Sequence, residues 1–205
     1  MLTARDEMIA EDVIRLGALT TGMVARAYWP HMRSGHQMAQ RRLLALYRAR
    51  RLDRRAQVRA DYVWVPPRSH RGDLEHALAV AQAWVELGCP KEFWTEHSLG
   101  SFRADALFRM GATPYFLEVE RSHNDLRTKM AKYMDTWRDR SVWSEQFASF
   151  PGLLLVVPSP EHVERAQALK GPPKHVCTLG GISKALTALS VAVGSQDTAE
   201  RMPAR

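Results

Sequence analysis

The stretch Arg103-Ala-Asp-Ala-Leu-Phe-Arg109, Met110-Gly-Ala-Thr113, Pro114-Tyr-Phe-Leu-Glu-Val-Glu120 decides the fold of the second half of this 205-residue chain. Its middle part is typical of a turn, because Gly111 tolerates backbone angles that other residues avoid. The two flanking parts therefore predict the strands of a β-hairpin. If residues 110–113 form the loop, Arg109 faces Pro114, and the same register sets Asp105 opposite Glu118.

Three carboxylates of this hairpin, Asp105, Glu118 and Glu120, are predicted to hold Mg²⁺ or Mn²⁺. Side chains two residues apart share one face of a strand. Like charges that face each other across a hairpin, about 5 Å apart, destabilise it, and a hard divalent cation removes that penalty by taking carboxylate oxygens. The alternative is that the acids face water. The apolar residues around them argue against it, since solvated strands are rarely hydrophobic on both faces.

Composition indicates a basic globular protein. The formal charge of +7 and the pI of about 9.8 favour a polyanionic partner, nucleic acid first. The two cysteines, Cys89 and Cys177, have no metal-type spacing and are expected to be free thiols in a reducing cytoplasm. We recognise no signal peptide, and the longest apolar run, residues 153–157, is too short to span a bilayer. We therefore expect a cytoplasmic location and no membrane partner.

Residues 1–66 are expected to form a winged helix-turn-helix domain that binds DNA. Helical periodicity follows Thr3 and stops at Gly17, a second helix starts at Thr20 or Thr21, and a third starts at Ser34. The alternating residues 62–65, with Val58 before them, predict the two strands of a wing. In this layout the third helix enters the major groove.

Arginines concentrate in the third helix and the wing. The candidate contacts to double-stranded DNA, at an origin or operator-like site, are Gln37, Gln40, Arg41, Arg42, Arg48, Arg54, Arg55 and Arg59. The alternative is a helical cap whose arginines lie over its own surface. Arginine-rich segments also suit RNA, so the preference for DNA depends on the shape of the module. A homodimer is a further expectation.

A second domain is expected over residues 70–193, after the linker at Pro66-Pro67, and residues 194–205 are expected to form a flexible tail. Its predicted elements are a helix from Asp73 to Gly88, a strand at 93–97, the hairpin, a helix at 124–138, a strand at 152–157, a helix at 161–169, a strand at 174–179 and a helix from 182 onward. This order predicts an α/β (α+β) domain, a mixed sheet flanked by helices.

The placement of Asp105 and of Glu118-x-Glu120 on successive strands resembles the PD-(D/E)XK restriction-endonuclease-like fold. With Lys129-Met-Ala-Lys-Tyr133, Glu75-His-Ala-Leu78 and the N-terminal module, the chain looks like the replication-relaxation family of plasmid and mobile-element proteins and the related MOB-C class of relaxases. The resemblance covers roughly residues 5–180. It implies metal-dependent DNA nicking, relaxase-like or nucleolytic, in replication or mobilisation.

One departure from the common nuclease pattern bears on the lysine of the site. That pattern has a lysine two residues after the strand glutamate, where this chain has Glu120. The relaxase resemblance implies a lysine moved to the following helix, either Lys129 or Lys132. The nucleophile is then a water molecule or Tyr133, although Tyr133 also falls on an apolar helix face. The competing function is a non-catalytic DNA-binding regulator that retains a nuclease-like core.

Overall fold

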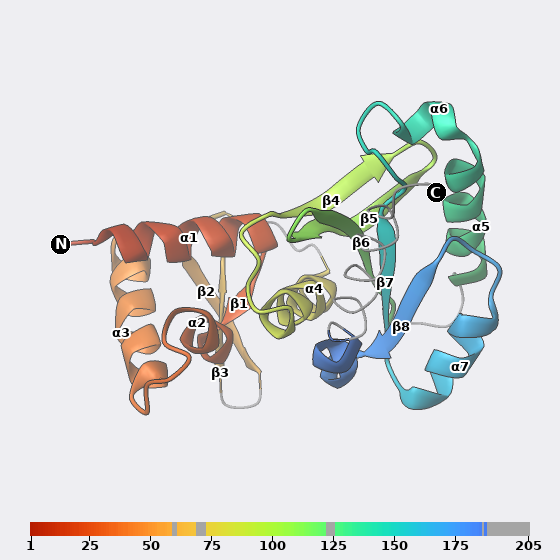
Figure 1. Cartoon of the computed structure of the whole chain (residues 1–205). Helices are drawn as coiled ribbons and strands as arrows, with labels where there is room; N and C mark the ends of the chain where they lie inside the picture. The colour runs from red at the N-terminus through yellow and green to blue at the C-terminus, as the bar shows by residue number, and fades with distance from the viewer. Residues whose placement is uncertain (59–60, 69–72, 122–125, 186, 188–205) are drawn as a thin grey trace, which may run out of the picture. The chain divides into compact units, whose positions relative to one another are not determined.

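The chain forms two compact units, which are described separately. A computed structural model describes residues 1–58, 61–68, 73–121, 126–185 and 187. Unit 1 covers residues 1–89, and unit 2 begins at Pro90 (Figure 1). None of the described helices is long and apolar enough to cross a membrane.

The helices of unit 1 begin where their capping residues predict. Helix α1 (Ala4–Leu16) starts after Thr3 and ends at Gly17, whose φ of 79° is the left-handed conformation that glycine tolerates. Helix α2 (Thr21–Tyr28) starts at Thr20, whose hydroxyl accepts a hydrogen bond of 3.1 Å from the Met23 backbone N–H. Helix α3 (Gly35–Arg48) follows Ser34.

Unit 1 also contains a three-stranded antiparallel sheet. Strands β1 (Leu19–Thr20), β2 (Asp53–Val58) and β3 (Asp61–Val65) lie in the order β1-β3-β2. Strands β2 and β3 match the predicted wing, whereas β1 was not predicted, because two residues carry no periodic pattern.

Helix α4 (Leu74–Glu86) belongs to unit 1, whereas the sequence suggested a domain boundary near residues 66–70. Its apolar residues Leu74, Ala77 and Leu78 pack against Ala18, Val63 and Val65. The prolines at 66 and 67 mark a linker in the local sequence. The division of the chain follows the burial of the α4 face, which local sequence does not reveal.

Unit 2 contains a five-stranded mixed sheet, which confirms the predicted α/β (α+β) class. Its strands are β4 (Phe93–Leu99), β5 (Phe102–Met110), β6 (Thr113–Val119), β7 (Gly152–Val157) and β8 (Lys174–Thr178), in that order across the sheet. Strands β4, β5 and β6 are antiparallel neighbours, and β6, β7 and β8 are parallel. The narrower assignments, to a winged helix and to a nuclease-like core, stay predictions.

The hairpin register agrees with the one predicted. Arg109 pairs with Pro114 and Ala106 with Leu117, so the continuation of the register sets Asp105 opposite Glu118. The loop is shorter than the expected residues 110–113, because the strands extend to Met110 and start again at Thr113. The two-residue turn requires the positive φ of 59° that Gly111 adopts.

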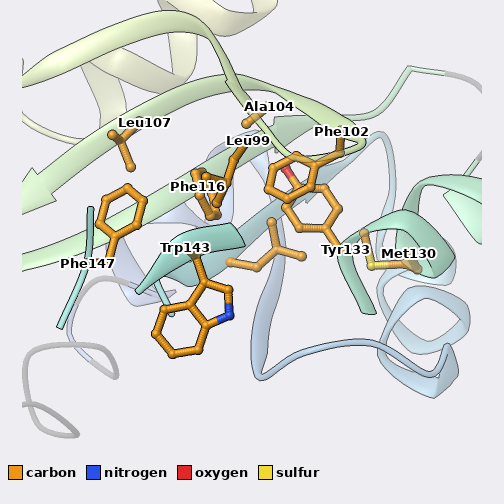
Figure 2. Packing of buried hydrophobic residues seen from close by; sticks show 10 residues of the cluster. Leu99, Phe102, Ala104, Leu107, Phe116, Met130, Tyr133, Trp143 and Phe147 are labelled. Carbon is orange, nitrogen blue, oxygen red and sulfur yellow. The ribbon is translucent and has the colours of Figure 1, made fainter. Parts of the chain in front are cut away.

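Helices α5 (Leu126–Arg138), α6 (Arg140–Trp143) and α7 (Pro160–Ala168) cover one face of this sheet, and a short 3₁₀ helix, η1 (Leu179–Gly181), follows β8. Figure 2 shows the core beneath α5 and α6, where aromatic rings from the strands meet Met130, Tyr133 and Trp143. Residues 182–185 are helical, as expected. The predicted helix start at 124 and the tail at 194–205 lie outside the described residues.

Candidate functional site

A groove of about 440 Å³ in unit 2 brings together four of the predicted catalytic residues: Glu118 of β6 and Lys129, Lys132 and Tyr133 of α5. The other wall is the β4–β5 turn with the adjoining strand ends, which contribute Ser98, Gly100, Ser101, Phe102 and Arg103. None of these five residues belongs to the site predicted from the sequence. The only signal they offer is a Ser-Leu-Gly-Ser run, which is equally typical of an ordinary turn.

Glu118 lies at the centre of this arrangement and is only 1% exposed. Its Oε2 accepts a hydrogen bond of 2.9 Å from Lys129 Nζ, and its Oε1 accepts one of 2.8 Å from the Tyr133 hydroxyl. Lys129 and Tyr133 are four residues apart on α5, so both point to the same strand. Each oxygen of the carboxylate therefore has a donor of its own.

The environment of Glu118 nevertheless disfavours its charge. Burial raises the pKa of this carboxyl group, the neighbouring charge of Asp105 raises it further, and Lys129 and Tyr133 offset only part of the increase, so the pKa is about 7. Groups with such perturbed pKa values in a groove are candidates for function. Glu118 is therefore the strongest candidate of the site.

The other two predicted carboxylates flank Glu118 in different ways. Asp105 is half-buried, and its Oδ2 accepts a hydrogen bond of 2.7 Å from the Val119 backbone N–H. Glu120 lies on the same side as Glu118, as predicted, with its Oε2 3.7 Å from Lys129 Nζ. Burial lowers the pKa of Lys129, but the charges of Glu118, Asp105 and Glu120 outweigh it and raise the pKa above its usual value.

The three-carboxylate metal site, Asp105, Glu118 and Glu120, stays a prediction. Among the described residues, no group of three or more His, Cys, Asp or Glu side chains is placed to hold a metal ion. The ammonium of Lys129 contacts both Glu118 and Glu120. Proteins usually hold Mg²⁺ through one or two carboxylates together with substrate phosphates, so a metal held by Asp105 and Glu118 stays a prediction.

Tyr133 is packed as a core residue. Its side chain is 1% exposed, and its ring stacks on Phe102 with the centroids 3.9 Å apart (Figure 2). Burial raises the pKa of its hydroxyl well above the usual value, and the charge of Glu118 acts in the same direction. Lys132, one residue earlier, is exposed at the groove.

Arg42 differs from the other predicted DNA contacts because it pairs within the protein. Its Nε donates a hydrogen bond of 2.6 Å to Oδ1 of the buried Asp6, and its terminal Nη2 contacts Oδ2 of the same carboxylate. Arg42 as a DNA contact stays a prediction, and this ion pair weighs against it. For Arg42 the alternative, an arginine over its own surface, describes the structure.

The remaining predicted DNA contacts have varied surroundings. Gln37, Arg41 and Arg48 of α3 are exposed, and Gln40 is half-buried. The Arg54 guanidinium lies over the ring of Tyr62, 4.5 Å from its centroid. Arg55 is half-buried, and Arg59 lies outside the described residues.

Comparisons with protein-family models, with curated proteins and with solved structures gave no match to this chain. The likeness to the replication-relaxation family therefore depends on the motifs quoted above.

Proposed function

We propose that the chain binds double-stranded DNA through unit 1 and nicks one strand at the groove of unit 2, as a relaxase-like protein or nuclease of a plasmid or mobile element. The observation that supports this proposal most directly is the burial of Glu118 next to the charge of Asp105. The groove that Glu118 lines is also lined by Lys129, Lys132 and Arg103. Acidic groups that favour a cation and basic groups that favour a phosphate then line one concave surface.

The residues of the groove have separate roles in this proposal. A divalent cation held by Asp105 and Glu118 would polarise the scissile phosphate. Lys129 stabilises the negative charge that develops on the phosphate. Lys132 and Arg103, both exposed, hold the sugar–phosphate backbone. Tyr133 is a positioning residue, because its hydroxyl holds Glu118 from inside the core.

The DNA-binding part of the proposal depends on the element order of unit 1. Helix α1, strand β1, helices α2 and α3 and the β2–β3 strand pair follow one another, and β1 pairs with β3. This order supports a winged helix, in which α3 would enter the major groove. Gln37 and Arg41, both exposed in the first half of α3, are the base-edge or phosphate contacts of this proposal.

A second function, that of a non-catalytic DNA-binding regulator, is favoured by one observation. Both oxygens of Glu118 already accept hydrogen bonds, one of them from a cationic lysine. A carboxylate neutralised in this way can stay buried without a metal ion. In that case the cluster stabilises unit 2 and takes no part in chemistry.

A nicking assay separates the two functions. We expect supercoiled plasmid to become nicked circles in the presence of Mn²⁺ and to stay supercoiled in excess EDTA. Glu118→Gln and Asp105→Asn should each reduce the rate about 100-fold, the range seen when an electrostatic group of a site is removed. The control Glu145→Gln removes an exposed acid outside the groove and should leave the rate unchanged. If the plasmid stays intact and calorimetry detects no Mn²⁺ binding, while the protein still binds duplex DNA, the non-catalytic regulator is the function that remains.

The nucleophile is tested by Tyr133→Phe. Because the ring of Tyr133 is buried, we expect this variant to retain nicking and the wild-type products to carry no attached protein. A covalent protein–DNA adduct that disappears in Tyr133→Phe would instead make Tyr133 the nucleophile.

A further inference from the structure

A second groove, of about 780 Å³, lies in unit 1 at the C-terminal end of α3 and the base of the β2–β3 strand pair. It is lined by Tyr47, Arg48, Arg50, Asp53, Pro67 and Arg68. Its volume is within the range of about 300–1,000 Å³ that is usual for small-molecule sites. The proposed nicking function makes no use of it.

The charge of this groove is not balanced by the residues around it. In the part of the chain that the structure describes, the guanidinium groups of Arg48, Arg50 and Arg68 form no ion pair with a carboxylate. Three arginines face one acid, Asp53, whose Oδ2 accepts a hydrogen bond of 3.0 Å from the Arg68 backbone N–H. The groove therefore favours an anion.

Two of these arginines adopt a backbone conformation that usually belongs to glycine. The φ angles are 57° at Arg50 and 60° at Arg68, in the left-handed region that disfavours residues with a Cβ. Arg50 follows the C-cap of α3, the position where helices commonly place glycine. The end of α3 accounts for the conformation of Arg50, whereas Arg68 adopts it away from any helix end. Strained backbone of the latter kind is concentrated at binding sites.

We propose that this groove binds a nucleotide, with its phosphates on Arg48, Arg50 and Arg68 and its base against Tyr47. Guanidinium groups bind phosphate oxygens in a bidentate manner. The Tyr47 side chain is 42% exposed. The Arg54 guanidinium lies over its ring, 5.6 Å from the centroid, so a base would stack on the ring face that Arg54 leaves.

The nucleotide site lies beyond the predicted duplex contacts along α3. Gln37 and Arg41 precede Arg48 by eleven and seven residues, which correspond to about 16 Å and 10 Å along a helix axis. Arg48 lines the groove, whereas Gln37 and Arg41 do not. Arg48 is thus assigned to the nucleotide rather than to the duplex.

The test is calorimetric titration of the full chain with ADP, pyrophosphate and adenosine. We expect saturable binding of ADP, weaker binding of pyrophosphate and none of adenosine. Arg50→Gly and Arg68→Gly should each weaken ADP binding about tenfold without lowering the unfolding temperature, because glycine accepts the positive φ of both positions. Tyr47→Leu should remove the preference for ADP over pyrophosphate. Arg33→Ala removes an exposed arginine of unit 1 outside the groove and should bind ADP as the wild type does.

Three results would overturn the proposal. One is the absence of saturable ADP binding at millimolar concentration. Another is equal binding of ADP and pyrophosphate, which would leave the base without a site. The third is an effect of Arg50→Gly and Arg68→Gly on duplex binding but not on ADP binding, which would assign the groove to the DNA surface.

Discussion

Unit 1 buries the carboxylate of Asp6 against a cation, and unit 2 does the same with Glu118, but the pKa values of these two acids are far apart. Asp6 in unit 1 is 0% exposed, and its pKa is lowered to about 2, chiefly by hydrogen bonding to Arg42. Glu118 in unit 2 is 1% exposed, and burial and the charge of Asp105 raise its pKa to about 7. Burial alone therefore does not decide the charge of an acid.

The difference lies in the number of donors and in the neighbouring charge. Asp6 is bound by two nitrogens of Arg42 and by the backbone N–H and hydroxyl of Thr3. Glu118 has one donor for each oxygen and a like charge, Asp105, beside it. A fully satisfied acid stabilises a fold, whereas an incompletely compensated acid is available for a ligand.

The largest expected effect concerns Asp6. Arg42→Ala leaves this buried carboxylate without its cation and should lower the free energy of unfolding by about 3 kcal/mol. The neighbouring exposed arginine supplies the matched control, since Arg41→Ala should change the stability by less than about 0.5 kcal/mol. Urea denaturation at pH 7 measures both. Equal effects of the two substitutions would contradict the assignment of Arg42 to the fold.

The second prediction concerns Glu118 and has the opposite sign. Glu118→Gln removes the buried charge beside Asp105 and should stabilise the protein by about 2 kcal/mol at pH 8. At pH 4, below the pKa of 4.5 in the unfolded chain, the wild-type carboxyl group is largely protonated in both states, so the difference should nearly vanish. Thermal unfolding at the two pH values measures it. A destabilised variant at pH 8 would mean that Lys129 and Tyr133 compensate the charge fully.

The third prediction is the pH dependence of the two acids in the wild type. The pKa of Asp6 is lowered in the folded state, so its stabilisation is lost as the pH falls from 3.8 to about 2. The pKa of Glu118 is raised, so its contribution is lost as the pH rises from 4.5 to about 7. Subtracting the stability profiles of Asp6→Asn and Glu118→Gln from that of the wild type isolates each window. The prediction would be contradicted if the contribution of Glu118 to stability changed only below pH 4.5.

The smallest expected effect concerns the Tyr133 hydroxyl, which donates a hydrogen bond to Glu118 from within the core. Tyr133→Phe keeps the ring on Phe102 and removes only the hydrogen bond to Glu118, which corresponds to about 1 kcal/mol. Because that bond favours the ionised acid, the pKa of Glu118 should rise further. Chemical denaturation at pH 8 gives the energy. A loss above about 3 kcal/mol would indicate that the hydroxyl has a larger structural role.

The sheet of unit 2 could be predicted because its signals are local. The continuous apolar run 152–157 coincides with β7, and Gly111 marks the turn that sets Asp105 opposite Glu118. The spacing of Lys129 and Tyr133 likewise places both on one helix face. Patterns within one element or one hairpin were thus enough to predict much of the fold of unit 2 and the grouping of the candidate residues.

The parts that could not be predicted depend on contacts between distant segments. Arg42 and Asp6 are 36 residues apart, and a count of charges treats every arginine as free. The pattern of α4 indicates that one face is buried but not that Ala18 and Val63 cover it. The contact of Lys129 with both Glu118 and Glu120 likewise depends on how α5 packs on the sheet.

Glu118 is a buried acid whose negative charge is only partly compensated, and we expect a divalent cation bound beside it to lower its pKa. The direct measurement is the titration of its carboxyl carbon by NMR, with and without Mg²⁺, using Glu118→Gln to assign the signal. We predict a midpoint near pH 7 in the absence of the metal and a midpoint below pH 5 in its presence. A midpoint at or below 4.5 that Mg²⁺ does not move would contradict the account.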